Sequence, residues 1–575
     1  MGEHDLVIRG GTVVDGTGAP GRTADVAIDG DRITEVGRVD GQGRREVAAD
    51  GLLVTPGFVD IHTHYDGQAA WDSHLTPSAQ HGVTTVVMTN CGVGFAPVFP
   101  HHRDRLIELM EGVEDIPGTA LHEGLSWDWQ SLPEYLDSLD GRPHDVDLAA
   151  QVPHGALRLH VMGERGADHT ERPTDDEIAE MGRLAAEGVA AGALGFTTSR
   201  TRNHRSSRGE LTPSLTADAD ELVGIAAALG RLGAGVLQVV SDFTDVEAET
   251  GLLRAMAAGS GRPLSVSLAA SSKGGRTYRR VLDAIEAMNA DGLRVRAQVA
   301  ARGIGILLGL QATMNAFSRG PSYKAVSGLA HAERLAALRE PARRAAILAE
   351  WPTHQLPYEG GFDRLFALGD PPNYEPAPDD SVGAEARRRN VPVEDLAYDL
   401  LLADDGRALL YSPIINYPGG NLDVAHELLS HPFAVPGLSD GGAHVGTICD
   451  ASFPTTLLTL WCRDRNRGER LSVEHVVRAQ CRETARAVGL ADRGVLAPGY
   501  RADVNVIDFD NLRLHAPRLV FDLPAGGKRL LQDVDGYRHT IVAGQETYAD
   551  GVPTGALPGR LVRGAQAGPA EARND

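Results

Sequence analysis

Residues 54–64 read VTPGFVDIHTH, and this stretch decides the fold that we predict for the chain. Residues 57–61 form an apolar run typical of a buried strand, and His62 and His64 follow at its carboxyl end. Side chains two residues apart on an extended strand point to the same face, so the two imidazoles can bind one ion. The spacing alone is weak evidence, because such pairs arise by chance in a chain with 21 histidines.

Further strand-like segments follow along the chain, separated by stretches rich in Ala, Leu, Glu and Arg that are typical of helices. Together with the first segment they are 57–61, 84–89, 147–152, 193–198, 235–240, 264–269, 293–299 and 433–438. Alternating strands and helices indicate βαβ units around a parallel sheet. Eight such units predict an α/β fold of the (β/α)8 TIM-barrel type, whose active site lies at the carboxyl ends of the strands.

Both ends of the chain show a different pattern, in which apolar and polar residues alternate in short runs. Residues 5–55 contain several such runs with Asp-Gly turns at 15–16 and 29–30, and similar runs return at 502–507 and 537–542. We therefore predict that the two ends complete one β domain. The strand-helix rhythm fails between residues 302 and 431, which indicates an insertion over the barrel mouth.

Composition excludes several classes of partner. A formal net charge of −23 opposes binding to a phosphate backbone, so we expect no nucleic acid partner. The four cysteines include no C-x-x-C pair, which argues against a disulfide framework or a zinc knuckle. The start of the chain lacks the features of a signal peptide, and no run approaches the roughly 20 apolar residues of a membrane span. We expect a cytoplasmic protein with no membrane partner. A homo-oligomer is compatible with the sequence.

Three more segments share their pattern with a known family. They read HGVTTVVMTNCG at 81–92, GLSDGGAH at 437–444 and LAPGYRAD at 496–503. With residues 54–64 they resemble the amidohydrolase superfamily and, within it, the D-aminoacylase (N-acyl-D-amino-acid deacylase) branch. The resemblance implies a TIM barrel plus a small β-sandwich made from both chain ends. The expected parts are the N-terminal sandwich 1–55, the metal-dependent barrel 56–485 with the insertion at about 302–431, the C-terminal sandwich 486–559, and a flexible tail 560–575.

The resemblance also implies a ligand set. The matching positions are His62, His64 and Cys91 as metal ligands, with Asp440 both touching the metal and acting as general base. A cation lowers the pKa of bound water to about 7, and a carboxylate beside it can pass the proton to the leaving nitrogen. Nitrogen, oxygen and sulfur donors together suit zinc. Without the motif, Cys91 would be read as a small buried core residue.

The sequence departs from the branch at the ends of strands five and six, where further metal histidines are expected. Val239 and Leu268 stand in their place, and neither can bind a cation. We therefore expect one zinc ion in preference to two. Asp242 is a possible substitute ligand, although an aspartate at a strand end is more often a helix cap or a turn residue.

Polar residues at other strand ends are candidates for contact with the substrate. Arginine forks suit a carboxylate, so Arg158, Arg200 or Arg202 can hold the α-carboxylate of an acylamino acid, with Arg200 as our first choice, and ordinary salt bridges are the alternative for each. The other candidates are His154, Lys273 and His444.

These observations predict an enzyme that hydrolyses a C–N amide bond other than a peptide bond. The expected substrate is a small molecule that carries a carboxylate, an N-acyl amino acid that the resemblance makes D-configured, attacked by metal-activated water with Asp440 as base. Two alternatives stay open: another amidohydrolase reaction, such as cyclic amide hydrolysis or deamination, or a catalytically silent barrel that binds a ligand.

Overall fold

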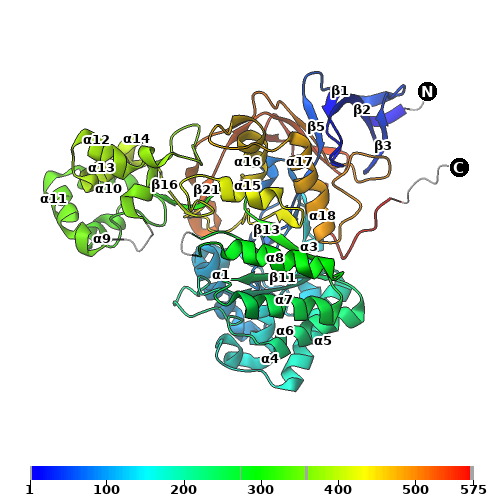
Figure 1. The fold of residues 1–575 in the computed structure, drawn as a ribbon, viewed down its shortest axis with the longest axis horizontal. Coiled ribbons are helices and arrows are strands. Elements are labelled where there is room, and N and C mark those ends of the chain that lie inside the picture. Colours follow the sequence, from blue (N-terminus) through cyan, green and yellow to red (C-terminus); the bar gives the residue numbers. More distant parts are fainter. Residues whose placement is uncertain (1–2, 272–273, 356–359, 570–575) are drawn as a thin grey trace.

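Parallel strands form the centre of the molecule (Figure 1). The computed structural model describes residues 3–271, 274–355 and 360–569. One sheet has the strand order β6-β7-β8 and a second has the order β17-β13-β12-β11-β10-β9. Each strand lies parallel to its neighbours and falls at a segment predicted from the sequence. The strands are β6 (Phe58–Asp60), β7 (Val83–Val87), β8 (Asp147–Ala149), β9 (Val152–Pro153), β10 (Gly195–Arg200), β11 (Val236–Ser241), β12 (Leu264–Ser267), β13 (Val295–Val299) and β17 (Ala434–Pro436).

The two sheets approach each other at both of their edges. β8 and β9 are consecutive in the chain and are separated by Ala150 and Gln151 alone. At the opposite edge, Thr63 after β6 forms a parallel bridge with Gly441 after β17. The His64 N–H donates to the Gly441 carbonyl at 2.7 Å. Among the described residues the ladders nevertheless form two sheets, not one closed sheet.

The central strands are buried on both faces, which explains their continuous apolar runs. Val86, Val239 and Val266 are fully buried examples. Helices connect the strands, and α5 begins at a capping box formed by Thr174 and Glu177. The helices of this part are α1 (Arg103–Glu114), α2 (Gly118–Gly124), α3 (Leu132–Asp140), α4 (His154–Met162), α5 (Asp175–Ala191), α6 (Ala219–Leu232), α7 (Val246–Ser260), α8 (Thr277–Ala290), α15 (Asp423–Ser430), α16 (Phe453–Thr456), α17 (Val473–Val477) and α18 (Thr484–Ala487).

A mixed sheet combines strands from both ends of the chain. Its order is β25-β24-β23-β18-β5-β1-β2-β3, with β4 paired to β1. β5 leads into β6 through Gly57, where a Cβ atom would lie 2.2 Å from the Thr84 hydroxyl. Glycine therefore lets this segment and β7 approach each other closely. The strands are β1 (Glu3–Val13), β2 (Arg22–Asp29), β3 (Arg32–Gly37), β4 (Gln42–Ala48), β5 (Leu53–Pro56), β18 (Val504–Ile507), β23 (Tyr537–Val542), β24 (Gln545–Ala549) and β25 (Val552–Pro553).

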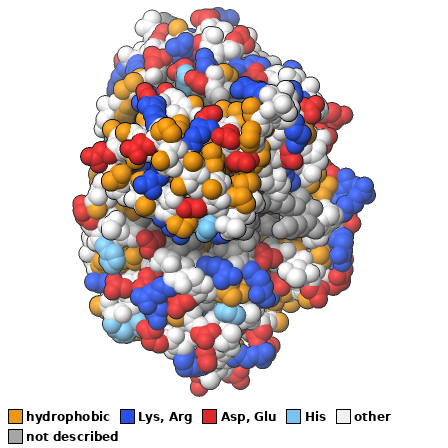
Figure 2. All heavy atoms as spheres, turned by 90° about the vertical axis from the view of Figure 1, so that its left-hand side faces the viewer, with side chains coloured by type: hydrophobic (Ala, Val, Ile, Leu, Met, Phe, Trp, Pro, Cys, Tyr) orange, Lys and Arg blue, Asp and Glu red, His pale blue; other side chains and the backbone are white. Residues whose placement is uncertain are grey.

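The described residues of 304–415 project to the left in Figure 1 and have their own hydrophobic core. Phe317, Leu338 and Tyr398 are buried within it. On the face that Figure 2 shows, hydrophobic side chains gather in the upper half, with acidic and basic side chains among them. The elements of this segment are β14 (Ile304–Leu308), α9 (Pro321–Ser327), α10 (His331–Arg339), α11 (Pro341–Glu350), β15 (Phe366–Ala367), α12 (Val382–Arg389), α13 (Val393–Leu401), α14 (Ala403–Gly406) and β16 (Leu410–Ile415).

The chain after residue 559 differs from the flexible tail that we expected. Leu561 and Val562 are buried, and the Val562 N–H donates to the carbonyl of Leu148 in β8 at 2.7 Å. Residues 560–562 therefore pack on β8, because two apolar side chains interrupt the polar composition of the tail. None of the helices in the described ranges combines the length and the apolar character needed to cross a membrane.

Candidate metal centre

Three side chains at the carboxyl ends of β6 and β7 form a compact buried cluster. His62 and His64 follow β6, and Cys91 follows β7. One ligand atom from each lies within 4.8 Å of the other two, and within the described ranges no other group of at least three such side chains meets this criterion. The distance between His62 Nε2 and Cys91 Sγ is 3.3 Å. The structure thus brings together three of the four predicted ligands in the geometry of a metal site.

Asp440, after β17, lies beside this cluster. Its Oδ1 atom is 3.5 Å from His62 Nε2 and 3.7 Å from His64 Nε2. His444, four residues later, places its Nε2 atom 3.9 Å from Asp440 Oδ2. All four predicted ligands and one predicted substrate residue therefore meet at the same end of the strands.

The backbone at these residues adopts a conformation that is unfavourable for side chains other than glycine. Cys91, Asp440 and His444 have φ angles of 57°, 48° and 50°. Positive φ at such residues costs on the order of 1 kcal/mol each and persists where the surroundings impose it. Three such residues in one cluster indicate that the placement of their side chains is under functional constraint.

Glutamine side chains hold the cluster from the adjoining strands. Gln298 of β13 places its Oε1 atom 2.6 Å from His62 Nδ1, and its Nε2 atom donates to Ser265 at 2.9 Å. An amide oxygen that accepts the Nδ1–H fixes the tautomer and leaves the lone pair on Nε2. Gln238 of β11 accepts the backbone N–H of Cys91 at 3.3 Å. Both contacts orient ligands toward a common centre.

Two further site residues were missed by sequence reasoning. Glu114, at the end of α1, is buried and lies 3.2 Å from His64 Nδ1. His204, in the loop after β10, places its Nδ1 atom 2.9 Å from Ser199 Oγ. Glu114 ends an ordinary amphipathic helix and gives no signal in the sequence. The sequence did give a signal for His204, because it belongs to the polar run at 197–204 after the fourth predicted strand.

Burial and neighbouring charges shift the pKa values of the cluster. Burial lowers the pKa of His62 to about 4 and raises that of the Cys91 thiol to about 12. Burial also opposes charge on His64 and Asp440. At His64 the charge of Glu114 and contact with Asp440 outweigh burial, and at Asp440 contact with His64 and the nearby imidazoles outweigh it. The pKa of His64 is therefore well above its usual value and that of Asp440 is below its own. Burial, followed by the nearby imidazoles of His444 and His64, lowers the pKa of His204 to about 3.

This donor set fits a zinc ion. A neutral imidazole at His62 has a free lone pair, and Asp440 is a carboxylate. The Nε2 atom of His64 is buried without a hydrogen-bond partner among the described residues, as expected for an atom that binds a cation, while Nδ1 lies 3.2 Å from Glu114. Two imidazoles, a thiol and a carboxylate match the nitrogen, sulfur and oxygen ligands of tetrahedral zinc sites.

The residues at the positions where the branch places further metal histidines, in β11 and after β12, provide no metal ligands. Val239 is fully buried and Leu268 is 2% exposed, and both belong to the hydrophobic core. Asp242 accepts hydrogen bonds from the Thr201 hydroxyl and the Arg202 backbone N–H. Its carboxylate thus joins the loop after β11 to the loop after β10, which is neither the helix cap nor the turn role that we considered as the alternative.

Several predicted substrate residues lie in ion pairs away from the cluster. Arg158 is buried against Glu221, which also contacts His154 Nε2 at 2.9 Å. Arg200 forms a two-pronged ion pair with Glu249 at 2.9 and 2.8 Å. These charges are already neutralised by a partner and are poorly suited to bind a substrate carboxylate.

The two remaining predicted substrate residues are Arg202 and Lys273. Arg202 is exposed, and among the described residues its guanidinium forms no ion pair. Lys273 lies outside the described residues.

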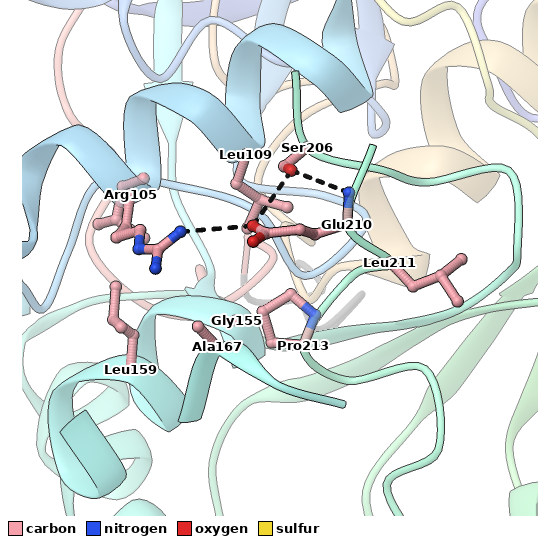
Figure 3. A pocket seen from close by; sticks show the side chains of 10 residues that line it. Arg105, Leu109, Gly155, Leu159, Ala167, Ser206, Glu210, Leu211 and Pro213 are labelled. Carbon is pink, nitrogen blue, oxygen red and sulfur yellow. Dashed lines mark hydrogen bonds and ion pairs between the residues drawn. The ribbon is translucent and has the colours of Figure 1, made fainter. Parts of the chain in front are cut away.

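Two small cavities lie near the centre. One, of about 20 Å³, is bordered by Asp440 and lined by polar and apolar residues that include Gln68, Val445, Ile448 and Arg529. The other, of about 30 Å³, is mostly apolar and lies between α1, α4 and the loop at 206–213 (Figure 3). Gly155 in its wall donates to the carbonyl of Gly92, next to Cys91. The first cavity therefore has room for about one water molecule beside the predicted base.

The family of the chain follows from its match to known sequences. A model of the Amidohydrolase family matches residues 45–353 and 404–548, which is most of the chain. The chain belongs to the amidohydrolase family. The unmatched residues 354–403 of this amidohydrolase lie within the segment that has its own core.

Relatives of this amidohydrolase include characterised and uncharacterised proteins. The D-aminoacylase of Alcaligenes xylosoxydans xylosoxydans is 40% identical over 195 residues, which are 34% of this chain and 37% of that protein. An uncharacterised protein of Mycobacterium tuberculosis is 28% identical over 549 residues, covering 88% of this chain and 84% of the relative. The chain thus matches little more than a third of the D-aminoacylase.

Solved structures show the same fold over nearly the whole chain. A D-aminoacylase studied for one-metal activation and second-metal attenuation of its binuclear centre has a TM-score of 0.65 and 25% identity, covering 97% of this chain and all of that one. The N-acyl-D-glutamate deacylase of Bordetella bronchiseptica, bound to zinc and a phosphonate mimic of the tetrahedral intermediate, has a TM-score of 0.63 and 24% identity, covering 98% of this chain and all of that one. The predicted resemblance to the D-aminoacylase branch is confirmed.

Proposed function

We propose that this amidohydrolase is a metal-dependent hydrolase that removes the acyl group from an N-acyl-D-amino acid. The observation that carries the proposal is the meeting of His62, His64, Cys91 and Asp440 at the carboxyl ends of strands. The family match supports the reaction class, and the matched D-aminoacylase supports the substrate class. We also propose that the eight strand positions close into a (β/α)8 barrel, with the mixed sheet forming the predicted sandwich.

Each residue of the centre has a part in this reaction. When bound, zinc supplies a positive charge that polarises the amide carbonyl and lowers the pKa of water to about 7. Asp440 accepts the proton of the attacking water and returns it to the leaving nitrogen. Gln298 keeps His62 oriented, and the small cavity beside Asp440 has room for the attacking water. His62, His64 and Cys91 would hold the ion.

We propose one zinc ion for each chain. Val239 and Leu268 occupy the positions at which the branch places further histidines, and both side chains pack in the core. Asp242 uses its carboxylate to accept hydrogen bonds from Thr201 and Arg202 in the loop after β10. The described residues therefore offer one complete set of ligands.

A panel of N-acyl amino acids tests the substrate. We expect the D enantiomers to be hydrolysed and their L enantiomers to be hydrolysed far more slowly, with activity lost in the presence of a zinc chelator. Release of the free amino acid, followed by chiral chromatography, measures both. Turnover of cyclic amides or amino-substituted rings, with no release from any N-acyl amino acid, would replace this function by another amidohydrolase reaction.

Arg202 is now our first candidate for binding the substrate carboxylate, in place of Arg200, because Glu249 already pairs with Arg200. We expect Arg202→Met to cost about 2–5 kcal/mol of transition-state stabilisation with a free-acid substrate and little with the matching primary amide. The measurement is kcat/KM for both substrates. Arg205→Met, at an exposed arginine of the same loop, is the control. An equal loss with both substrates would remove Arg202 from this role.

A further inference from the structure

Glu114 is a buried carboxylate that joins two histidines of the metal centre. Glu114 is 1% exposed, and its Oε1 atom lies 3.2 Å from His64 Nδ1. Its Oε2 atom lies 3.7 Å from His444 Nε2, and its backbone carbonyl accepts the His444 N–H. The next residue, Asp115, accepts the Gly446 N–H at 3.2 Å. The end of α1 is thus fastened to the loop that follows Asp440.

The two nitrogens of His64 face different groups. Nδ1 faces Glu114, and Nε2 lies 3.7 Å from Asp440. His62 has the same arrangement, but its Nδ1 atom faces the neutral amide of Gln298 at 2.6 Å. Both imidazoles therefore direct Nε2 toward Asp440 while different acceptors stand behind them. A carboxylate behind a ligand histidine fixes the tautomer and raises the basicity of the ligating nitrogen.

We infer that Glu114 is a positioning residue that sets the affinity of the centre for its cation. It holds the imidazole of His64 with Nε2 toward the ion, and it anchors His444 beside Asp440. Its negative charge favours a cation in the centre, because an unpaired carboxylate buried there would be unfavourable. The inference rests on the proposed metal dependence and adds a residue that the ligand motif does not contain.

The test is the zinc affinity of Glu114→Gln, which removes the charge and keeps the shape of the side chain. Competition with a chromophoric chelator should show zinc binding weakened by about 10- to 100-fold. The thermal midpoint of the metal-free protein should stay close to that of the wild type, which separates this role from a general structural one. Asp104→Asn, at an exposed carboxylate of the same helix, should leave zinc affinity unchanged.

The outcomes separate this inference from the proposed function. A wild type that binds zinc, with Glu114→Gln binding it equally well, overturns the role of Glu114 alone. A wild type that binds no zinc overturns the proposed function as well. Glu114→Asp keeps the charge but withdraws it by one methylene, so intermediate affinity is expected. If Glu114→Gln does not fold, Glu114→Asp decides: weaker zinc binding supports the inference, and unchanged binding overturns it.

Discussion

Asp440→Asn is expected to remove nearly all turnover while the protein keeps its fold. The side-chain amide cannot accept a proton from the attacking water, and it removes a negative charge that lies 3.5 Å from His62 and 3.7 Å from His64. Loss of a general base typically lowers the rate by about 10²- to 10⁴-fold, and a weaker contact with the cation adds to this. Asn has nearly the same shape, so the loop after β17 should be retained.

The measurement compares kcat for an N-acyl-D-amino acid between Asp440→Asn and the wild type, each saturated with zinc. Asp283→Asn, at an exposed aspartate of α8, is the control for loss of a carboxylate and should be fully active. Retention of more than about a tenth of the activity by Asp440→Asn would show that another group is the base, because that loss is smaller than a general base supplies.

Local patterns in the sequence were sufficient for the strands, whereas the ligand cluster was expected from the resemblance to the D-aminoacylase branch. The strands are buried on both faces, so each appears as an apolar run, and the order of these runs gives the parallel sheets. His62, His64, Cys91 and Asp440 each end or follow such a run, so their meeting follows from the fold. A short polar motif after a strand is visible without knowledge of distant contacts.

Contacts between distant parts of the chain could not be predicted in this way. Gln298 reaches His62 across 236 positions, and nothing near either residue announces the pair. Arg200 was our first choice as carboxylate anchor. Glu249 follows it by 49 positions in the sequence, and the fold brings the two together in an ion pair that neutralises the arginine. Glu114 was missed for the same reason, since its role depends on where α1 ends relative to His64.

The second large effect is expected from removal of the metal. Without a cation the cluster lacks a nucleophile for amide hydrolysis, because burial raises the pKa of the Cys91 thiol to about 12 and keeps it protonated. A metal-free protein should therefore bind substrate without turning it over. Full activity should return with zinc, and the buried donor set predicts that one equivalent is enough.

The most direct test is a zinc titration of the chelator-stripped protein, with hydrolysis of an N-acyl-D-amino acid as the readout and bound zinc measured on the same samples. The proposed function predicts no turnover at zero zinc and a linear rise that ends at one equivalent for each chain. Turnover by protein shown to contain no metal, or a rise that continues to two tightly bound equivalents, would contradict a hydrolase with one metal ion at His62, His64, Cys91 and Asp440.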